Sequence, residues 1–301
     1  MDLVGKRVSV RHRGTDGVRD VVGRVLVADA DGLRIERRDG ELAFVPAGTV
    51  LAMRVVPDRP LRRRRATAIS AEDLSRVTSR GWPAVESVAL GDWELRASGG
   101  FTGRANSVAV HGTPGVADPF TAVIDFYERR GLRPLAQLVE GSDWDRRFVD
   151  AGWHPVSDQP PGAIVQVADL AAPPPPDPDA LVSDGASDAW LAQYGRVADP
   201  ALARAVMEGP PTVGFVSIGE VAIGRVVVTG EWAGLAAVEV VPGHRRQGLA
   251  RRVVETSLAW AVAHGADKAY LQTMRDNTAA LALYEPYGFT THHAYRYLTV
   301  G

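Results

Sequence analysis

The chain has 301 residues, of which 46% are hydrophobic and 23% are charged, and it contains no cysteine. This composition is ordinary for a globular protein and excludes wholesale disorder, a disulfide scaffold, a thiol nucleophile and a Cys-ligated metal. No window of about 18 uninterrupted apolar residues is present, and the start of the chain lacks the apolar core of a signal peptide. We therefore expect a cytoplasmic protein with no membrane partner.

The net charge of −2 is unevenly distributed. Residues 1–65 hold 15 Lys/Arg against 9 Asp/Glu, whereas the remainder holds 19 against 27. The first segment is thus suited to an anionic partner, while the body would repel one and would attract cationic acceptors weakly. Nucleic acid is not an expected partner of the body. The arginine run at 62–65 is interpreted as part of a solvated Arg/Pro linker at 59–69.

Residues 1–58 are typical of a small all-β module. The pairs Asp31-Gly32 and Asp39-Gly40 separate segments rich in β-branched residues and have the composition of hairpin turns. Five short strands in this length favour a closed barrel that resembles an SH3-like module. Its role is either to dock a partner or to pack on its neighbour. The strands are predicted at 3–10, 20–28, 32–37, 42–45 and 51–56.

From Ser70 the pattern changes to alternating helices and strands. Ser70 precedes two acidic residues and Asp118 precedes Pro119, and both arrangements are typical of helix starts. Residues 70–170 are therefore predicted to form an α/β half. Its helices are predicted from 70, at 118–131 and at 144–151, and its strands at 85–90, 93–97, 107–110, 135–139 and 163–167.

A proline-rich linker at 171–179 precedes a second half at 180–301. The five prolines of the run PPPPDP at 173–178 supply no amide donors, and the run favours extended structure. The element order then repeats that of the first half, which predicts a tandem duplication. Strands are predicted at 180–183, 213–218, 221–229, 235–241, 268–273 and 289–298, and helices at 188–197, 200–208, 248–264 and 278–287.

The stretch VEVVPGHRRQGLARRVV, residues 238–254, joins an apolar strand to a long amphipathic helix through a short loop. Amide groups at a helix start lack intrahelical acceptors, and the helix dipole adds positive partial charge, so this corner attracts anions. Gly248 lets a phosphate approach the main chain, while Arg245 and Arg246 add formal charge. The corner predicts a ligand that carries a diphosphate. It lacks the spacing of a Walker loop and of a dinucleotide fingerprint.

Two groups of residues resemble the signatures of the GNAT superfamily of N-acetyltransferases. The central signature, a Val two before Pro and then Arg/Gln-x-x-Gly-x-Gly/Ala, is matched by Val240, Pro242, Arg245, Gly248 and Ala250. The second signature is matched by Asn277, Ala280, Leu281, Tyr284, Glu285, Gly288 and Phe289. With the N-terminal module, the arrangement resembles the mycobacterial, histone-acetyltransferase-like type of this superfamily.

The resemblance implies an α/β (α+β) GNAT fold, tandem with a degenerate first half, and acetyl-CoA as co-substrate without a metal. The strand before the loop would carry a bulge that frees main-chain groups around Val238 to Val240 for the pantetheine arm. The loop amides would hold the pyrophosphate, Asn277 would lie beside the pantetheine, and Tyr284 would reach the thioester sulfur. The implied cofactor-binding residues are Val238, Val240, Arg245, Arg246, Gln247, Gly248, Leu249, Ala250, Asn277 and Tyr284.

The chemistry of direct acetyl transfer suggests roles for some of these residues. The amine must lose a proton before it attacks, and the departing thiolate needs a proton or hydrogen bond, which the Tyr284 phenol can give. A strand amide near Val240 is the expected oxyanion donor. Glu239 is the candidate base, although strand alternation turns it away from Val238 and Val240, so a salt bridge on the far face is the alternative. Asp184 and Glu231 are weaker candidates.

Other polar residues have structural alternatives. Asn277 can also cap the helix that starts near it. Neighbouring strand residues point to opposite faces and no third ligand is evident, so His292 and His293 are assigned no metal. The first half lacks the Arg/Gln-x-x-Gly loop, and we expect that it has lost CoA binding and packs against the second half or shapes its acceptor pocket. Arg104 and Asn106 would contact substrate there or fix a turn.

These patterns predict an acetyl-CoA-dependent N-acetyltransferase whose catalytic domain is residues 180–301. The acceptor is a primary amine, either a protein lysine, N-terminus or basic peptide, or a small-molecule amine. The non-enzymatic alternative is a CoA-binding sensor or scaffold protein without turnover.

Overall fold

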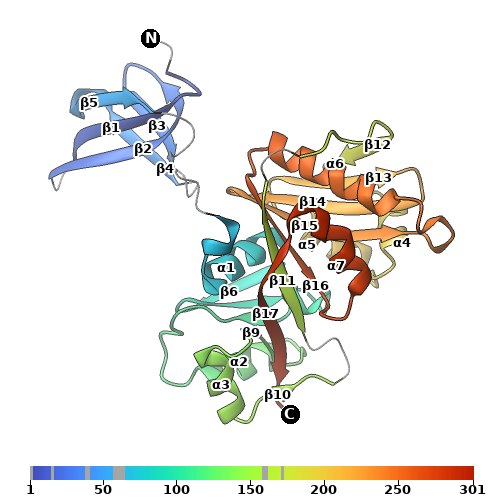
Figure 1. Cartoon of the computed structure of the whole chain (residues 1–301). Coiled ribbons are helices and arrows are strands. Elements are labelled where there is room, and N and C mark those ends of the chain that lie inside the picture. The colour runs from blue at the N-terminus through green and yellow to red at the C-terminus, as the bar shows by residue number, and fades with distance from the viewer. Residues whose placement is uncertain (1–2, 15–16, 38–40, 57–64, 158–161, 171–172) are drawn as a thin grey trace. The chain divides into compact units, whose positions relative to one another are not determined.

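The computed structural model describes residues 3–14, 17–37, 41–56, 65–157, 162–170 and 173–301. The chain divides into two compact units, Met1–Arg64 and Arg65–Gly301 (Figure 1). The turn expected at Asp39-Gly40 lies outside the described residues, as do most of the arginine run at 62–65 and the start of the linker at 171–179.

The first unit is an open antiparallel sheet with the strand order β4-β3-β2-β1-β5. A closed barrel requires its two edge strands to pair with each other. After a 3₁₀ turn, Ala47–Thr49, the chain instead crosses to the far edge, where β5 pairs with β1, and no β4–β5 pairing occurs among the described residues. The prediction of a closed SH3-like barrel is therefore wrong in this respect. The strands are β1 (Arg7–Gly14), β2 (Gly17–Ala28), β3 (Gly32–Arg37), β4 (Leu42–Pro46) and β5 (Val50–Val55).

The first half of the second unit begins its helices with short polar side chains, as the sequence predicts. The Ser70 hydroxyl and the Asp118 carboxylate accept the amides of Asp73 and Thr121, which satisfies donors that the helices leave open. The elements are α1 (Ala71–Gly81), β6 (Glu86–Leu90), β7 (Trp93–Ala97), β8 (Val108–Ala109), α2 (Pro119–Glu128), β9 (Leu135–Val139), α3 (Asp143–Asp150), β10 (His154–Pro155) and β11 (Gly162–Asp169).

The second half starts with an edge strand and two helices and ends with a long strand. Ser187 and Asp199 cap its first two helices through side-chain oxygens. The elements are β12 (Ala180–Ser183), α4 (Asp188–Tyr194), α5 (Pro200–Met207), β13 (Val213–Ile218), β14 (Ala222–Thr229), β15 (Trp232–Val240), α6 (Leu249–Ala263), β16 (Lys268–Thr273), α7 (Thr278–Tyr284) and β17 (Thr290–Thr299).

All described strands of the second unit belong to one sheet, in the order β12-β13-β14-β15-β16-β11-β17-β9-β8-β7-β6, with β10 paired to β17. The last strand of each half lies beside the other half: β11 pairs with β16, and β17 pairs with β9. The two end strands also pair antiparallel with each other and lie side by side at the middle of the unit (Figure 1). Separating the halves would therefore break the centre of the sheet.

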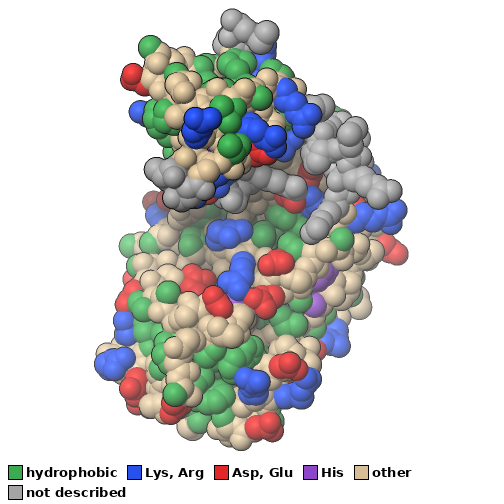
Figure 2. Space-filling view, turned by 90° about the vertical axis from the view of Figure 1, so that its left-hand side faces the viewer, with side chains coloured by type: hydrophobic (Ala, Val, Ile, Leu, Met, Phe, Trp, Pro, Cys, Tyr) green, Lys and Arg blue, Asp and Glu red, His purple; other side chains and the backbone are tan. Residues whose placement is uncertain are grey.

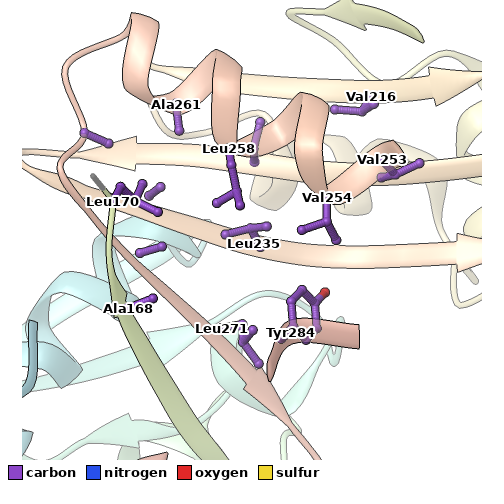
Figure 3. Packing of buried hydrophobic residues seen from close by; sticks show 14 of the residues in the cluster. Ala168, Leu170, Val216, Leu235, Val253, Val254, Leu258, Ala261, Leu271 and Tyr284 are labelled. Atoms are coloured by element: carbon purple, nitrogen blue, oxygen red, sulfur yellow. The ribbon is translucent and has the colours of Figure 1, made fainter. Parts of the chain in front are cut away.

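The hydrophobic core of the second half lies between α6 and the sheet. Val254 and Leu258 of α6 point toward Leu235 of β15, and Tyr284 of α7 closes the cluster from the other side (Figure 3). Leu258 and Leu235 are 2% and 3% exposed. This packing fixes the start of α6 relative to β15, which positions the corner between them.

The outer surface shows no large area of one charge on the face seen in Figure 2. Acidic and basic side chains are interspersed there, separated by hydrophobic and uncharged side chains. Neither sign of charge dominates the part of this face that belongs to the second unit.

His292 and His293 contact each other, contrary to the expectation that they point to opposite faces. The register between β11 and β17 shifts beside His292, because His293 pairs with Val165 while Thr291 pairs with Gln166. The extra residue turns the two rings together, and their Nδ1 atoms lie 2.8 Å apart. His292 Nε2 also lies 2.9 Å from the Ile69 carbonyl oxygen.

We predict that the buried His111 and the half-buried His293 make the fold sensitive to mild acid. Burial lowers the pKa of His111 and of His293 from 6.5 to about 4. The unfolded chain therefore takes up more protons between pH 6.5 and 4, so the free energy of unfolding falls as the pH drops through this window, by about 3 kcal/mol per histidine.

Urea unfolding at pH 7 and pH 4.5 measures this loss, and His111→Phe should reduce it by about half. Both ring nitrogens of His111 are buried without a hydrogen-bond partner among the described residues, so phenylalanine costs no hydrogen bond at pH 7. An unchanged loss in the variant would contradict the assignment.

Candidate active site

β15 and β16 separate at the centre of the sheet. They pair in parallel only from Trp232 to Leu235 of β15, whereas β16 continues along β11 as far as Thr273. The ladder between β14 and β15 shifts register at the same level, and Ala237 has a φ of 54°. This bulge turns the end of β15 away from β16, so within the described residues 236–240 have no strand partner on that edge.

The predicted corner joins this separated strand to α6. The first intrahelical bond runs from the Arg252 amide to the Gly248 oxygen, so the amides at the helix start have no intrahelical acceptor. Gly248 has a φ of 81° and caps the helix without a side-chain hydrogen bond, and Arg246 has a φ of 63°. The Arg245 Nε donates to the Val240 oxygen over 3.2 Å, which ties the loop to the end of β15.

The geometry of this corner fits an anion. Residues 242–248 are exposed, including both arginines and Gln247, while Leu249 is buried and Ala250 is half-buried. Open amides, the positive end of a 15-residue helix and two guanidinium groups therefore converge on solvent. The β15 edge at 236–240 and the start of α6 thus both carry main-chain groups without a strand or helix partner, and the internally bonded 3₁₀ turn Pro242–His244 joins them.

Tyr284 lies at the C-terminal end of α7 and is 6% exposed. Its ring packs edge-on against Phe289 at 5.5 Å between centroids. Burial, and then the nearby negative charge of Glu239, raise the pKa of this phenol well above its ordinary value of 10. The hydroxyl is therefore protonated at neutral pH and available as a donor.

Glu239 forms the predicted salt bridge. Its carboxylate accepts from the Arg196 guanidinium at 2.7 Å, which places it on the face that carries α4 and α5. Asn277 caps α7, because its Oδ1 accepts the Ala280 amide at 3.1 Å. Glu239 and Asn277 therefore both have structural roles.

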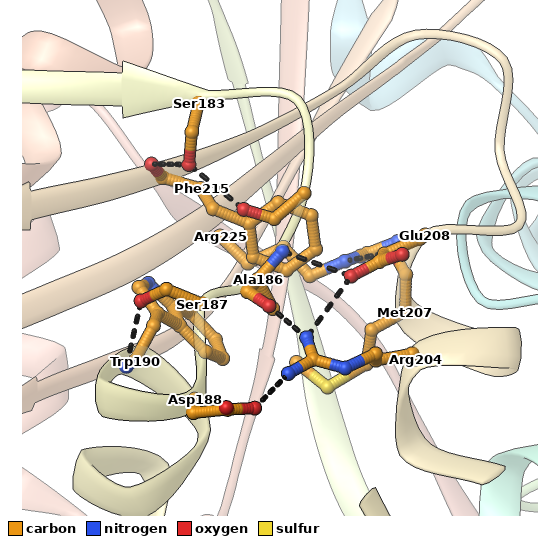
Figure 4. A network of polar contacts seen from close by, with 11 residues as sticks. Ser183, Ala186, Ser187, Asp188, Trp190, Arg204, Met207, Glu208, Phe215 and Arg225 are labelled. Carbon is orange, nitrogen blue, oxygen red and sulfur yellow. Dashed lines mark hydrogen bonds and ion pairs between the residues drawn. The ribbon is translucent and has the colours of Figure 1, made fainter. Parts of the chain in front are cut away.

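The face opposite α6 is built partly by the first half. Arg204 holds the start of α4 through the Ala186 oxygen and Asp188, and the Arg225 Nε donates to the Met207 oxygen at the end of α5 (Figure 4). Beside them, Arg104 lies over the Trp82 ring at 4.1 Å.

The turn that carries Arg104 is fixed by Asn106. Its amide side chain accepts from the amides of Ser98 and Gly100 and donates to the oxygens of Phe101 and Thr102. This confirms the structural alternative for Asn106.

Sequence reasoning missed Trp82, Arg196, Arg225 and Gln272 on this face. Their neighbours come from distant parts of the chain, and no local motif marks them. Of these four residues, only Arg225 stands out in the sequence, because it is a charged residue inside an otherwise apolar strand pattern.

Among the described residues, no group of three or more His, Cys, Asp or Glu side chains could hold a metal ion. No helix of the described chain is long and apolar enough to cross a membrane.

Comparison with known proteins identifies the class. The family model for the C-terminal region of the probable histone acetyltransferase Rv0428c matches residues 70–298. The probable histone acetyltransferase Rv0428c of Mycobacterium tuberculosis is 28% identical over 98% of this chain and 95% of its own. The uncharacterized N-acetyltransferase YobR of Bacillus subtilis is 26% identical over 74% of this chain and 96% of its own.

A solved structure supports the fold. The GCN5-related N-acetyltransferase from Kribbella flavida superposes with a TM-score of 0.51 and 17% identity, and the match covers 78% of this chain and 95% of that one. The fold and the corner thus define a GNAT N-acetyltransferase that uses acetyl-CoA. The chain belongs to the family of the Rv0428c C-terminal region.

We predict that Gly248→Val weakens acetyl-CoA binding at least tenfold. Valine at a φ of 81° costs about 1–2 kcal/mol and would shift the amides that face the anion. Gly265→Val is the matched control, since Gly265 has a φ of 93° beyond the other end of α6 and, like Gly248, has no atom within 4 Å of an added Cβ. Calorimetry should show weaker binding in the first variant alone, and equal losses in both would contradict the placement of the cradle.

Proposed function

We propose that this chain transfers acetyl from acetyl-CoA directly to a primary amine, with the reacting groups at the point where β15 and β16 separate. The observation that supports this most is the open main-chain groups of two segments, the β15 edge at 236–240 and the start of α6. Such groups are costly in a folded protein unless water or a ligand satisfies them.

These two segments suit different parts of acetyl-CoA. The amides from Arg246 to Ala250, with the guanidinium groups of Arg245 and Arg246, would bind the pyrophosphate. The free edge at Val238 and Val240 would pair with the amides of the pantetheine arm, as an added strand does. The exposed Asn277 would lie beside this arm while it caps α7.

The transfer needs only proton movements from the protein. The amine lone pair would attack the thioester carbon, forming a C–N bond and a transient oxyanion, to which a β15 amide near Val240 would donate. The C–S bond would then break, and the Tyr284 hydroxyl would donate to the departing thiolate. The proton lost by the amine would leave through Glu239 or water, with Arg196 as the partner of that carboxylate.

The first half is proposed to have lost CoA binding. Helix α2 crosses from β8 to the parallel strand β9, just as α6 crosses from β15 to β16. At the start of α2, however, the Asp118 carboxylate accepts the Thr121 amide and Pro119 supplies no N–H. A negative charge therefore occupies the place that a pyrophosphate would need.

We expect one acetyl-CoA per chain for this reason. Isothermal titration should give a stoichiometry near one, and Gly248→Val should weaken that single event. A second binding event that survives Gly248→Val would contradict the assignment of the first half.

Replacing Tyr284 by Phe separates an enzyme from a CoA sensor. We expect turnover to fall about 100-fold because the thiolate loses its donor, with little change in acetyl-CoA affinity. Tyr287→Phe is the control, since the Tyr287 hydroxyl donates to Glu255 at 3.0 Å and not toward the gap. CoA release over a panel of amines measures turnover; binding without release from any amine would favour the sensor.

The name of one relative gives a starting point for choosing acceptors to test. The name of the mycobacterial relative suggests a protein lysine as acceptor, and the wild-type panel should therefore include lysine peptides beside small amines.

A further inference from the structure

A small pocket lies on the α4 and α5 face of the sheet, at the level where β15 leaves β16. Gly234, Leu235 and Ala236 of β15 form one wall, and Gln272 of β16 forms another. The centre of a water-sized sphere can move within about 10 Å³ of this pocket. The pocket therefore has room for about one water molecule or one ligand oxygen. Because residues of both β15 and β16 line it where the two strands separate, the pocket adjoins the place where the amine would meet the thioester.

Two arginines line this pocket, and no carboxylate does. Arg104 lies over the Trp82 ring at 4.1 Å, and Arg225 lies over the same ring at 4.8 Å. The pKa of Arg225 is lowered to about 10, mainly by burial and partly by the charge of Arg104. The two guanidinium groups thus lie close enough to repel each other.

The partners of these guanidinium groups are neutral oxygens. Arg225 donates to the main-chain oxygens of Met207 and Gly81, at the ends of α5 and α1. Arg104 donates to the Gln272 Oε1 over 3.3 Å, a long bond to an oxygen that also accepts from Tyr295. Neither arginine has an ion-pair partner among the described residues.

A cation pair without a counter-charge beside a reaction centre favours an anionic ligand group. It disfavours a second cation such as a lysine ammonium. We propose, resting on the acetyltransferase function above, that the acceptor carries a carboxylate a few bonds from its amine, as an amino acid does, and that Arg104 binds this carboxylate.

The proposed contact also assists the reaction itself. One carboxylate oxygen would occupy the water-sized pocket while the half-buried Arg104 would hold the other. The same positive charges disfavour the ammonium form of the nearby amine, so its proton leaves more readily. Arg104 is thus a specificity-determining residue that the first half supplies to the site of the second.

Steady-state kinetics with matched acceptors tests the proposal. Each pair consists of a free amino acid and its carboxamide, with a lysine peptide as a third substrate. The carboxylate member should have a kcat/KM about 10–100-fold higher, as expected for a charge-assisted hydrogen bond. Equal use of both members, or preference for the lysine peptide, would overturn the proposal.

The variant Arg104→Gln should abolish this preference, mainly by raising KM for the carboxylate member, with little effect on the carboxamide. Arg104→Lys should restore part of it. Arg147→Gln is the matched control. Arg147 also lies over a tryptophan, at 4.7 Å, but it belongs to α3 and does not line the pocket. An equal loss for both members of a pair would show a merely structural role and contradict the proposal.

A binding measurement keeps this test separate from that of the proposed function. If no amine is acetylated although acetyl-CoA binds, the proposed transfer fails. Calorimetric titration of amino acids into the protein–CoA complex then tests whether Arg104 binds a carboxylate. Binding that requires the carboxylate and Arg104 would support the anion site, whereas no binding would overturn it.

Discussion

The structure depends on one departure from regular sheet geometry, the separation of β15 from β16 after Leu235. A sheet normally satisfies its main-chain groups through the neighbouring strand, and leaving them open at its centre is unfavourable. The bulge at Ala237 makes the separation, and the pairing of β16 with β11 on its other side keeps that strand in place. The gap is therefore built into the fold and does not need a ligand to open it.

Strand pairing between the two halves supports this gap. Because β11 belongs to the first half yet pairs with β16, the far wall of the gap is anchored in a segment that precedes the second half in sequence. The proline-rich segment between them is held as well, since Asp177 and Asp179 both accept from Arg252 in the first turns of α6. The first half thus stabilises the gap in the second half.

Local signals were sufficient for the corner and for most elements. Helix caps such as Ser70 and Asp118 and the Gly248 corner follow from patterns within a few residues, whereas the bulged strand was expected only from the resemblance to the superfamily. The strand exchange, the open edge of the first unit and the contact of His292 with His293 depend on pairings between distant segments, so no short pattern predicts them. The same holds for Arg225, whose two acceptors lie 18 and 144 residues away.

Two buried arginines hold comparable places in the two halves but have different partners. Arg96 on β7 and Arg225 on β14 each precede the strand that leads into a crossover helix, and both are 1% exposed. Arg96 makes four hydrogen bonds, to Ser79, Gln137 and two oxygens of Ser107, which use four of its five N–H donors. Arg225 has two main-chain acceptors and lines a pocket beside the gap. Arg96 therefore acts as internal support in the first half, whereas Arg225 places positive charge beside the gap in the second.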